Sequence, residues 1–163
     1  MFIQTLLRST VPMLAIVSLT VISAAAAELP SKKYLNLATV KTMIAAAEAE
    51  AQRQHVDITI VIVDENGNLL FLERGDGVGI NTLQWAQKKA RHAAFYRAPS
   101  KDGADMVKNG NVAALAWPEF FPGQGGLPII VDGQILGAIA ASGSKSEIDE
   151  KIAQAGLDAL QKK

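Results

Sequence analysis

The sequence predicts an α+β domain of three layers, in which helices cover both faces of a largely antiparallel sheet. Two observations support this fold class. Runs of β-branched and aliphatic residues flank two turn dipeptides, Asn66-Gly67 and Asp132-Gly133, which are typical of β-hairpins. Segments with helical character precede, separate and follow these hairpins. Because a hairpin joins neighbouring strands in opposite directions, we expect an antiparallel sheet.

The first helix and the first hairpin occupy residues 36–73. From Asn36 to Gln54, apolar residues recur at intervals of three and four, which predicts an amphipathic helix. The run from Asp57 to Asp64 is hydrophobic almost throughout, so we expect a strand that is covered on both faces. After a turn at residues 65–68, the partner strand is expected from Leu69 to Glu73.

The middle of the chain is predicted to be helical. One helix is expected from Thr82 to Arg97, where it must end before Pro99, and a shorter one within residues 100–110. Residues 111–126 are rich in proline, glycine and aromatic side chains, which predicts a loop that includes at most one short strand.

The second hairpin and a closing helix complete the domain. Strands are expected at Leu127–Val131 and Gln134–Ala141, and the helix at Ser146–Leu160. Ser146 is placed to cap this helix. Three acidic residues in or near its first turn suit the positive end of the helix dipole: Glu147, Asp149 and Glu150.

The N-terminus decides the expected compartment. Arg8 precedes an apolar stretch from Val11 to Ile22, and Ala25-Ala26-Ala27 fits the pattern that signal peptidase cleaves. We therefore expect residues 1–27 to be a signal peptide, residues 28–163 to form the domain, and the mature protein to be periplasmic or secreted, without a membrane span. The alternative is an uncleaved anchor, for which the apolar run is close to the short limit for spanning.

Composition excludes several classes of function. The 16 basic and 16 acidic side chains cancel, and no basic stripe is present, which argues against binding of nucleic acid. The absence of cysteine excludes disulfides, a thiolate nucleophile, an iron–sulfur cluster and a cysteine-ligated zinc.

No catalytic residues are assigned from the sequence. Ser142 lies in Ala141-Ser142-Gly143, which lacks the first glycine of a nucleophile elbow. The glycines within residues 74–80 do not have dinucleotide-binding spacing and are interpreted as turn residues. No spacing of histidines and carboxylates is typical of a metal site.

The helix at residues 82–97 presents two interactive faces. One face consists mostly of alanines and can lie close to a sheet; its residues are Leu83, Ala86, Ala90, Ala93 and Ala94. A second stripe, spaced four, three and four apart, is formed by Trp85, Lys89, His92 and Tyr96. This stripe suits packing against another helix or subunit. It also suits a flat apolar ligand held by Trp85 and Tyr96, with His92 facing a metal.

Several short motifs, spread over residues 36–160, resemble those of the GlcG/HbpS-like haem-binding family. They are Val63-Asp64 with Gly67 and Leu69, Arg74-Gly75-Asp76-Gly77, Lys89 to Phe95, Arg97-Ala98-Pro99-Ser100, Gly125 to Ile129 with Asp132-Gly133, Gly137-Ala138-Ile139 with Ser142-Gly143, and Asp149 leading to Ala153 to Leu157. The chain departs from the family's usual pattern in having His92 where threonine is common, and Ala140-Ala141 where a Gly-Val pair is common.

The resemblance implies a PAS- or profilin-like fold, assembly into homo-oligomers and haem as a cofactor. The function it implies is a haem or redox sensor, or a haem carrier, with a membrane-bound sensor or receptor as a partner. The alternative is an accessory protein or small enzyme of organic-acid catabolism that binds a small molecule other than haem. Self-association is also expected, because the second stripe and the aromatic residues Trp117, Phe120 and Phe121 offer more apolar surface than so small a domain can bury alone.

Haem iron needs an axial donor, and without cysteine the candidates are His55, His92, a tyrosine, Met43 and Met106. The favoured candidate is His92, because Trp85 and Tyr96 share its stripe and could stack on a porphyrin while Lys89 pairs with a propionate. His55 lies at the end of the first helix, where a structural role is expected. The expected haem-binding residues are therefore His92, Trp85, Tyr96 and Lys89.

Overall fold

The computed structural model describes residues 28–161. Contacts divide the chain into two units, Met1–Ser31 and Lys32–Lys163, and the fold described here is that of the second. The predicted signal peptide, residues 1–27, lies outside the described residues. Within the described part of the chain, no helix is both long enough and apolar enough to cross a bilayer.

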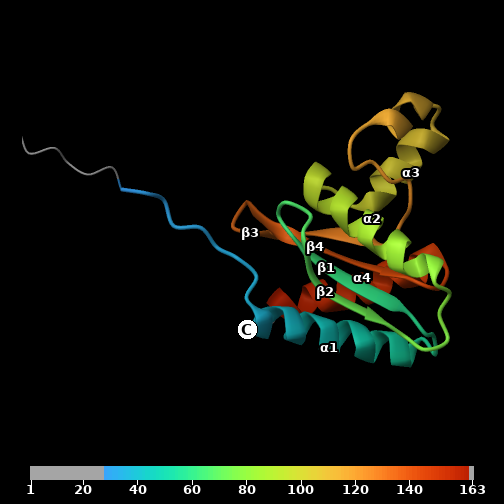
Figure 1. Cartoon of the computed structure of the whole chain (residues 1–163), viewed down its shortest axis with the longest axis horizontal. Coiled ribbons are helices and arrows are strands. Elements are labelled where there is room, and N and C mark those ends of the chain that lie inside the picture. The colour runs from blue at the N-terminus through green and yellow to red at the C-terminus, as the bar shows by residue number, and fades with distance from the viewer. Residues whose placement is uncertain (1–27, 162–163) are drawn as a thin grey trace, which may run out of the picture. The chain divides into compact units, whose positions relative to one another are not determined.

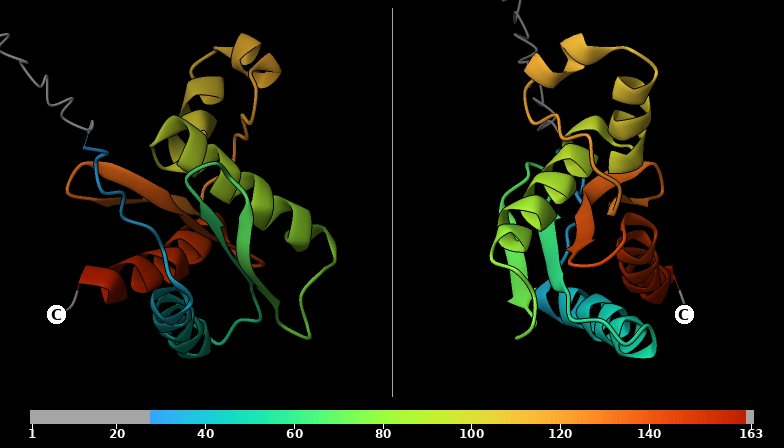
Figure 2. Two further views of the ribbon diagram at one scale, coloured as in Figure 1. Left: turned by 60° about the vertical axis from the view of Figure 1, so that its left-hand side comes forward. Right: turned by 90° about the vertical axis from the view of Figure 1, so that its right-hand side faces the viewer.

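The domain has three layers, with a four-stranded antiparallel sheet in the middle (Figures 1 and 2). The strands are in the order β2-β1-β4-β3, and they are β1 (Thr59–Asp64), β2 (Leu69–Arg74), β3 (Gly126–Val131) and β4 (Gln134–Ser142). One face carries α1 (Leu37–Arg53) and α4 (Ser146–Gln161), and the other carries α2 (Asn81–Tyr96). The predicted α+β class and its three layers are confirmed.

An arm of two short helices follows α2 (Figure 2). It consists of α3 (Ser100–Lys108) and the 3₁₀ helix η1 (Val112–Ala116). In both views the arm projects beyond the end of α2, away from α1 and α4. The sequence allowed one short strand within residues 111–126, and the structure has η1 there instead. A backbone N–H of Trp117 that donates to Ala114 closes this turn, and nearby prolines lack the N–H donors that a strand ladder requires.

The central strand β1 is buried on both faces, as its sequence predicts. Ile60 and Ile62 pack in the core beneath α1 and α4, whereas Val61 and Val63 pack beneath α2. Alternation along one strand therefore supplies both cores.

Short polar motifs end these elements. The side chain of Asn36 accepts a hydrogen bond from the backbone N–H of Thr39, 2.8 Å away, and caps α1. In the first hairpin turn, Asp64 accepts from the backbone of Asn66 and Asn68, and Gly67 adopts a φ of 80° that favours glycine.

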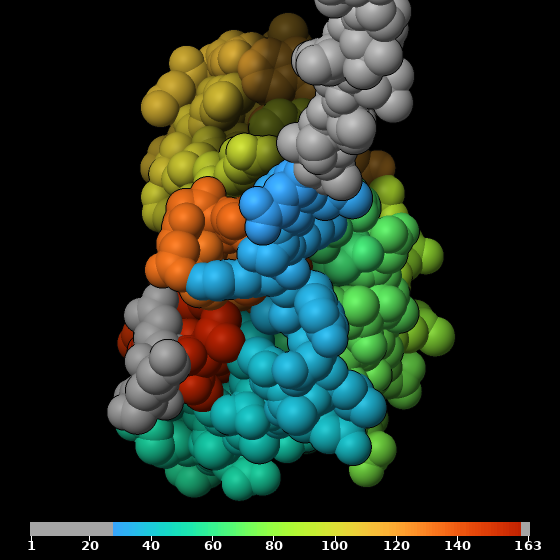
Figure 3. Space-filling model, turned by 90° about the vertical axis from the view of Figure 1, so that its left-hand side faces the viewer, coloured from blue at the N-terminus to red at the C-terminus, as the bar shows by residue number. Residues whose placement is uncertain are grey.

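Both hairpin turns are also tied to the segment that leads into α1 (Figure 3). Lys32 forms an ion pair with Glu65 in the first turn, and Lys33 forms one with Asp132 in the second. These exposed pairs are of the kind that contributes little to stability.

The alanine face of α2 lies directly on the sheet. Four alanines pack against valines of β1 and alanines of β4: Ala86, Ala90, Ala93 and Ala94. A Cβ atom added at Gly126 would come within 2.4 Å of the Lys89 carbonyl oxygen, which shows how closely α2 approaches β3. This close packing sets the position of the side chains on the remaining faces of α2.

Candidate functional site

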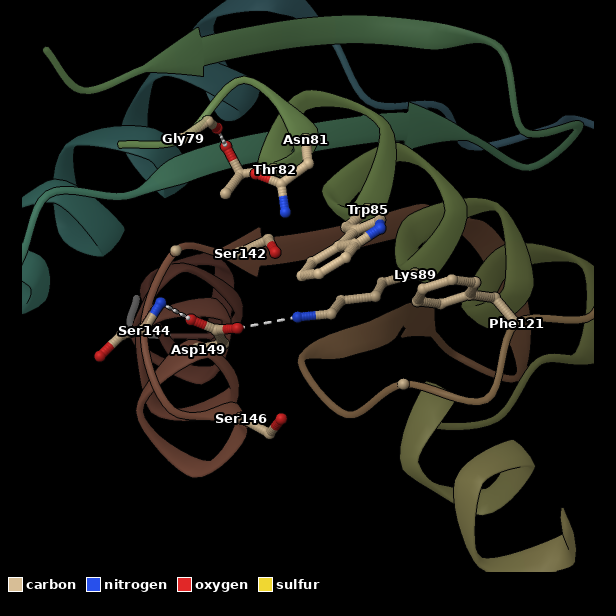
Figure 4. Close-up of a pocket in the computed structure, with 12 residues that line it drawn as sticks. Gly79, Asn81, Thr82, Trp85, Lys89, Phe121, Ser142, Ser144, Ser146 and Asp149 are labelled. Carbon is tan, nitrogen blue, oxygen red and sulfur yellow. Dashed lines mark hydrogen bonds and ion pairs between the residues drawn. The ribbon is translucent and has the colours of Figure 1, made fainter. Parts of the chain in front are cut away.

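A hollow of about 410 Å³ lies between α2, the end of β4 and the start of α4 (Figure 4). It is lined by Gly79, Asn81, Thr82, Trp85, Lys89, Phe121, Gly123, Ser142, Gly143, Ser144, Ser146 and Asp149. Its volume is in the range typical of small-molecule sites.

A buried ion pair lies at the base of this hollow. The Nζ atom of Lys89 donates to Oδ2 of Asp149, 2.8 Å away, and to the carbonyl oxygen of Ala141, 3.0 Å away (Figure 4). The two side chains are only 6% and 3% exposed. Burial raises the pKa of Asp149, and the Lys89 ammonium and the backbone N–H of Ser144 oppose this effect. The pair places two charges of opposite sign in the interior, where removal of either would leave the other uncompensated.

Hydroxyl groups form a second polar feature beside the ion pair. Thr82 donates its hydroxyl proton to the Gly79 carbonyl oxygen at 2.6 Å, so the 2.7 Å contact between the Thr59 and Thr82 hydroxyls uses the proton of Thr59. These bonds fasten the start of α2, which lacks a side-chain cap, to β1. Ser142 pairs with Thr59 across the sheet and is 2% exposed, and its Oγ has no hydrogen-bond partner among the described residues.

Aromatic side chains form two walls of the hollow. Trp85 projects from α2 and is 48% exposed, and Phe121 approaches from the loop before β3 (Figure 4). An exposed indole beside a hollow offers a flat apolar surface to a ligand.

His92 lies one turn further along α2, outside the lining of the hollow. It is buried, and its ring contacts those of Tyr96 and Phe120, with centroids 4.7 and 5.2 Å away. Its Nδ1 accepts the backbone N–H of Phe121 at 2.9 Å. Because a backbone N–H can only donate, Nδ1 carries no proton, and the neutral ring holds its proton on Nε2. Burial lowers the pKa of His92, and Asp102 opposes this effect.

Gly103 of α3 makes room for this imidazole. A Cβ atom at position 103 would lie 2.8 Å from Cε1 of His92 and 3.2 Å from the Phe121 carbonyl oxygen. His92 is therefore enclosed by α2, α3 and the loop that carries Phe120 and Phe121.

The structure separates the predicted haem-binding residues into two pairs. Trp85 and Lys89 line the hollow, whereas His92 and Tyr96 pack together beside Phe120. The Tyr96 hydroxyl donates to the Pro118 carbonyl oxygen at 2.7 Å. The assignment of His92 as an iron ligand stays a prediction. His55 is exposed just after α1, with a φ of 54°.

Sequence reasoning did not place Asp149, Ser142 or Phe121 in the site. The sequence predicts an interaction of Asp149 with the helix dipole, and it argues against Ser142 as a nucleophile. One signal could have identified Asp149. Lys89 lies on a helix whose other face packs on the sheet, and such a lysine needs an acidic partner, which Asp149 near the start of α4 provides. In the described part of the chain, no group of three or more histidine and carboxylate side chains is placed to hold a metal ion.

The model of the protein family described as "Haem degrading protein HbpS-like" matches residues 35–158. Protein GlcG of Escherichia coli strain K12 is 35% identical over 112 residues, which cover 69% of this chain and 84% of GlcG.

Two crystal structures have the same fold. ORFY of Klebsiella pneumoniae superposes with a TM-score of 0.75 at 26% identity, covering 84% of this chain and 98% of ORFY. A double mutant of HbpS from Streptomyces reticuli gives 0.74 at 28% identity, covering 88% of this chain and 98% of HbpS. These similarities confirm the family resemblance found in the sequence.

Proposed function

The chain belongs to the HbpS-like family, and we propose that it binds haem. The main observation behind this proposal is that residues 35–158 match the model of a family of haem-degrading proteins. The hollow beside Trp85 and Phe121 supports it, because a porphyrin is flat and largely apolar and stacks on aromatic side chains.

The lining residues fit the macrocycle better than they fit the iron. Trp85 and Phe121 offer apolar surface, but none of the described residues that line the hollow is a histidine, tyrosine or methionine. Bound haem would supply one-electron chemistry or an open coordination position. The contribution of this chain would be to hold the ring between its aromatic walls and to exclude water from one face.

His92 is the proposed axial donor, and it is buried outside the lining of the hollow. For His92 to reach iron bound there, the loop that carries Phe121 would have to move away from it. Its Nε2 carries a proton while Nδ1 accepts from Phe121, so ligation through Nε2 requires that this contact be released and the proton move to Nδ1. Haemin binding should then alter the amide signal of Phe121.

The proposal is tested by titrating the purified protein with haemin and following the Soret band. A saturating shift at one haem per chain is expected. His92→Ala should lose the shift or bind much more weakly, and His55→Ala should match the wild type. A Soret band that stays at the position of free haemin throughout would refute the proposal. An unchanged spectrum in both variants would exclude His92 as the ligand.

We further propose that the protein is periplasmic or secreted and serves as a haem sensor or carrier, with a membrane-bound receptor as a partner. The support for export is the signal-like sequence at residues 1–27. A sensor role would require that the presence of haem change binding to the receptor, which a pull-down with and without haemin measures.

A second candidate function is the binding of a small molecule other than haem. The observation that favours it is the polar floor of the hollow, where the Lys89–Asp149 pair lies beside several hydroxyls: Thr82, Ser142, Ser144 and Ser146. A small oxygenated compound would find hydrogen-bonding partners there.

A further inference from the structure

Ser142 presents to the hollow a hydroxyl group that forms no hydrogen bond with any described residue. The residue is 2% exposed, it lines the hollow, and its Oγ has no hydrogen-bond partner in the described part of the chain. The hydroxyl protons of Thr59 and Thr82 are already donated to Thr82 and to the Gly79 carbonyl oxygen, so neither is available to Ser142. Because Ser142 lines the hollow, a ligand atom placed there can take up the hydrogen bond that no described residue makes with this hydroxyl.

Lys89 offers a second donor at the same place. An ammonium group has three N–H donors, and two of them are used, by Asp149 and by the carbonyl oxygen of Ala141. The third is not used by any described residue, and Lys89 lines the hollow. Ala141 and Ser142 are consecutive in β4, so the lysine amine is bonded to the residue next to the free hydroxyl.

The charges of Lys89 and Asp149 at the floor of the hollow determine which kind of ligand oxygen can bind there. The Lys89 ammonium is already balanced by the Asp149 carboxylate, so the floor has no net charge to offer an anion. A ligand carboxylate would have to share the lysine with Asp149 and would repel it. A neutral carbonyl oxygen can accept from both donors without this cost.

We propose that the floor of the hollow is a subsite for the carbonyl oxygen of a planar, uncharged ligand, held by the Ser142 hydroxyl and the third N–H of Lys89. Trp85 and Phe121 then contact the flat part of the ligand (Figure 4). This inference rests on the hollow being the ligand site, as the proposed function does, but it requires neither porphyrin nor iron.

The test is an NMR titration with acetophenone, which carries one carbonyl on a planar ring. The chain has two tryptophans, Trp85 in the hollow and Trp117 on the arm, and Trp117→Phe assigns their indole signals. Acetophenone should shift the Trp85 indole signal and leave that of Trp117 in place. Ser142→Ala removes one oxygen atom and should raise the Kd about five- to tenfold, the effect of one lost hydrogen bond.

Thr42→Ala is the matched control, since it removes an exposed hydroxyl from α1 on the other face of the sheet. Its Kd should stay within about twofold of the wild type. Equal Kd values for Ser142→Ala and wild type, or no shift of Trp85, would overturn the proposal.

The ligand can be varied instead of the protein, which covers the case that Ser142→Ala does not fold. Ethylbenzene lacks the oxygen and should bind the wild type at least about fivefold more weakly than acetophenone, and benzoate should also bind more weakly. Equal binding of acetophenone and ethylbenzene would overturn the proposal. A haemin titration of the same proteins separates the two hypotheses, because Ser142→Ala should keep its Soret shift.

Discussion

The backbone N–H of Phe121 donates to Nδ1 of His92 across 2.9 Å, and this contact joins a wall of the hollow to the buried side of α2. The two side chains belong to different surroundings, since Phe121 lines the hollow and His92 packs against Tyr96 and Phe120. Protonation of His92 at Nδ1 would therefore remove the acceptor that holds the backbone of Phe121 in place.

The pH dependence of stability should report this contact. Burial lowers the pKa of His92 in the folded protein below the 6.5 of the free side chain, so the unfolded chain binds more protons as the pH falls below about 6.5. The free energy of unfolding should then decrease between pH 7 and pH 5. His92→Asn keeps an acceptor for Phe121 without titrating, and in urea unfolding it should lose part of this decrease. His55→Asn is the control, and a slope shared by all three proteins would contradict the assignment.

Removal of the Lys89 charge should be strongly destabilising. Lys89→Met leaves the buried carboxylate of Asp149 without its partner, which costs about 3–5 kcal/mol of unfolding free energy. Adding Asp149→Asn removes that charge and keeps an acceptor for Ser144, so the double variant should be more stable than the single one.

A pH series gives an independent check of this pair. In Lys89→Met, burial still raises the pKa of Asp149, so the folded state takes up the proton first and the variant should regain stability as the pH falls. Two results would count against the buried pair. One is a double variant whose loss of unfolding free energy equals the sum of the losses in Lys89→Met and Asp149→Asn. The other is a Lys89→Met protein that loses stability on acidification as the wild type does.

Self-association is expected from the apolar arm. Val112, Leu115 and Trp117 are each more than 40% exposed, and such side chains seldom stay exposed together in a monomer. Sedimentation velocity should show an oligomer at micromolar concentration, and Leu115→Asp should shift it toward the monomer. Leu37→Asp changes an equally exposed leucine on α1 and should have no such effect. A wild-type monomer under these conditions would refute the expectation.

Export should remove the first 27 residues. Mass spectrometry of the protein recovered from the periplasm or medium is expected to give Glu28 as the first residue, because Ala25-Ala26-Ala27 fits the cleavage pattern. Recovery of the protein with Met1 to Ala27 intact would show that the segment is retained.

Local patterns predicted the fold better than they predicted the site. Asn36, Gly67 and the alanines of α2 act on their immediate neighbours or on one face of the sheet, so spacing and turn chemistry revealed their roles. The partners Lys89 and Asp149 are 60 residues apart, and no periodicity connects them.

The stripe on α2 is a second case in which local sequence did not reveal which residues lie together. Trp85, Lys89, His92 and Tyr96 share one side of a helix, and the sequence therefore grouped them around one ligand. The loop carrying Phe120 and Phe121 divides this stripe, leaving Trp85 and Lys89 in the hollow and enclosing His92. The path of that loop depends on contacts with α3 that local sequence does not encode.

The measurement that tests haem binding at the hollow most directly compares the two tryptophans. Both are partly exposed, at 48% and 43%, but only Trp85 lines the hollow. Haemin titrations followed at the Soret band should give a Kd at least about tenfold higher for Trp85→Ala than for wild type, because a stacking surface is lost. Trp117→Ala should stay within about twofold. A wild type without a saturable Soret shift, or equal Kd values for Trp85→Ala and wild type, would contradict the account.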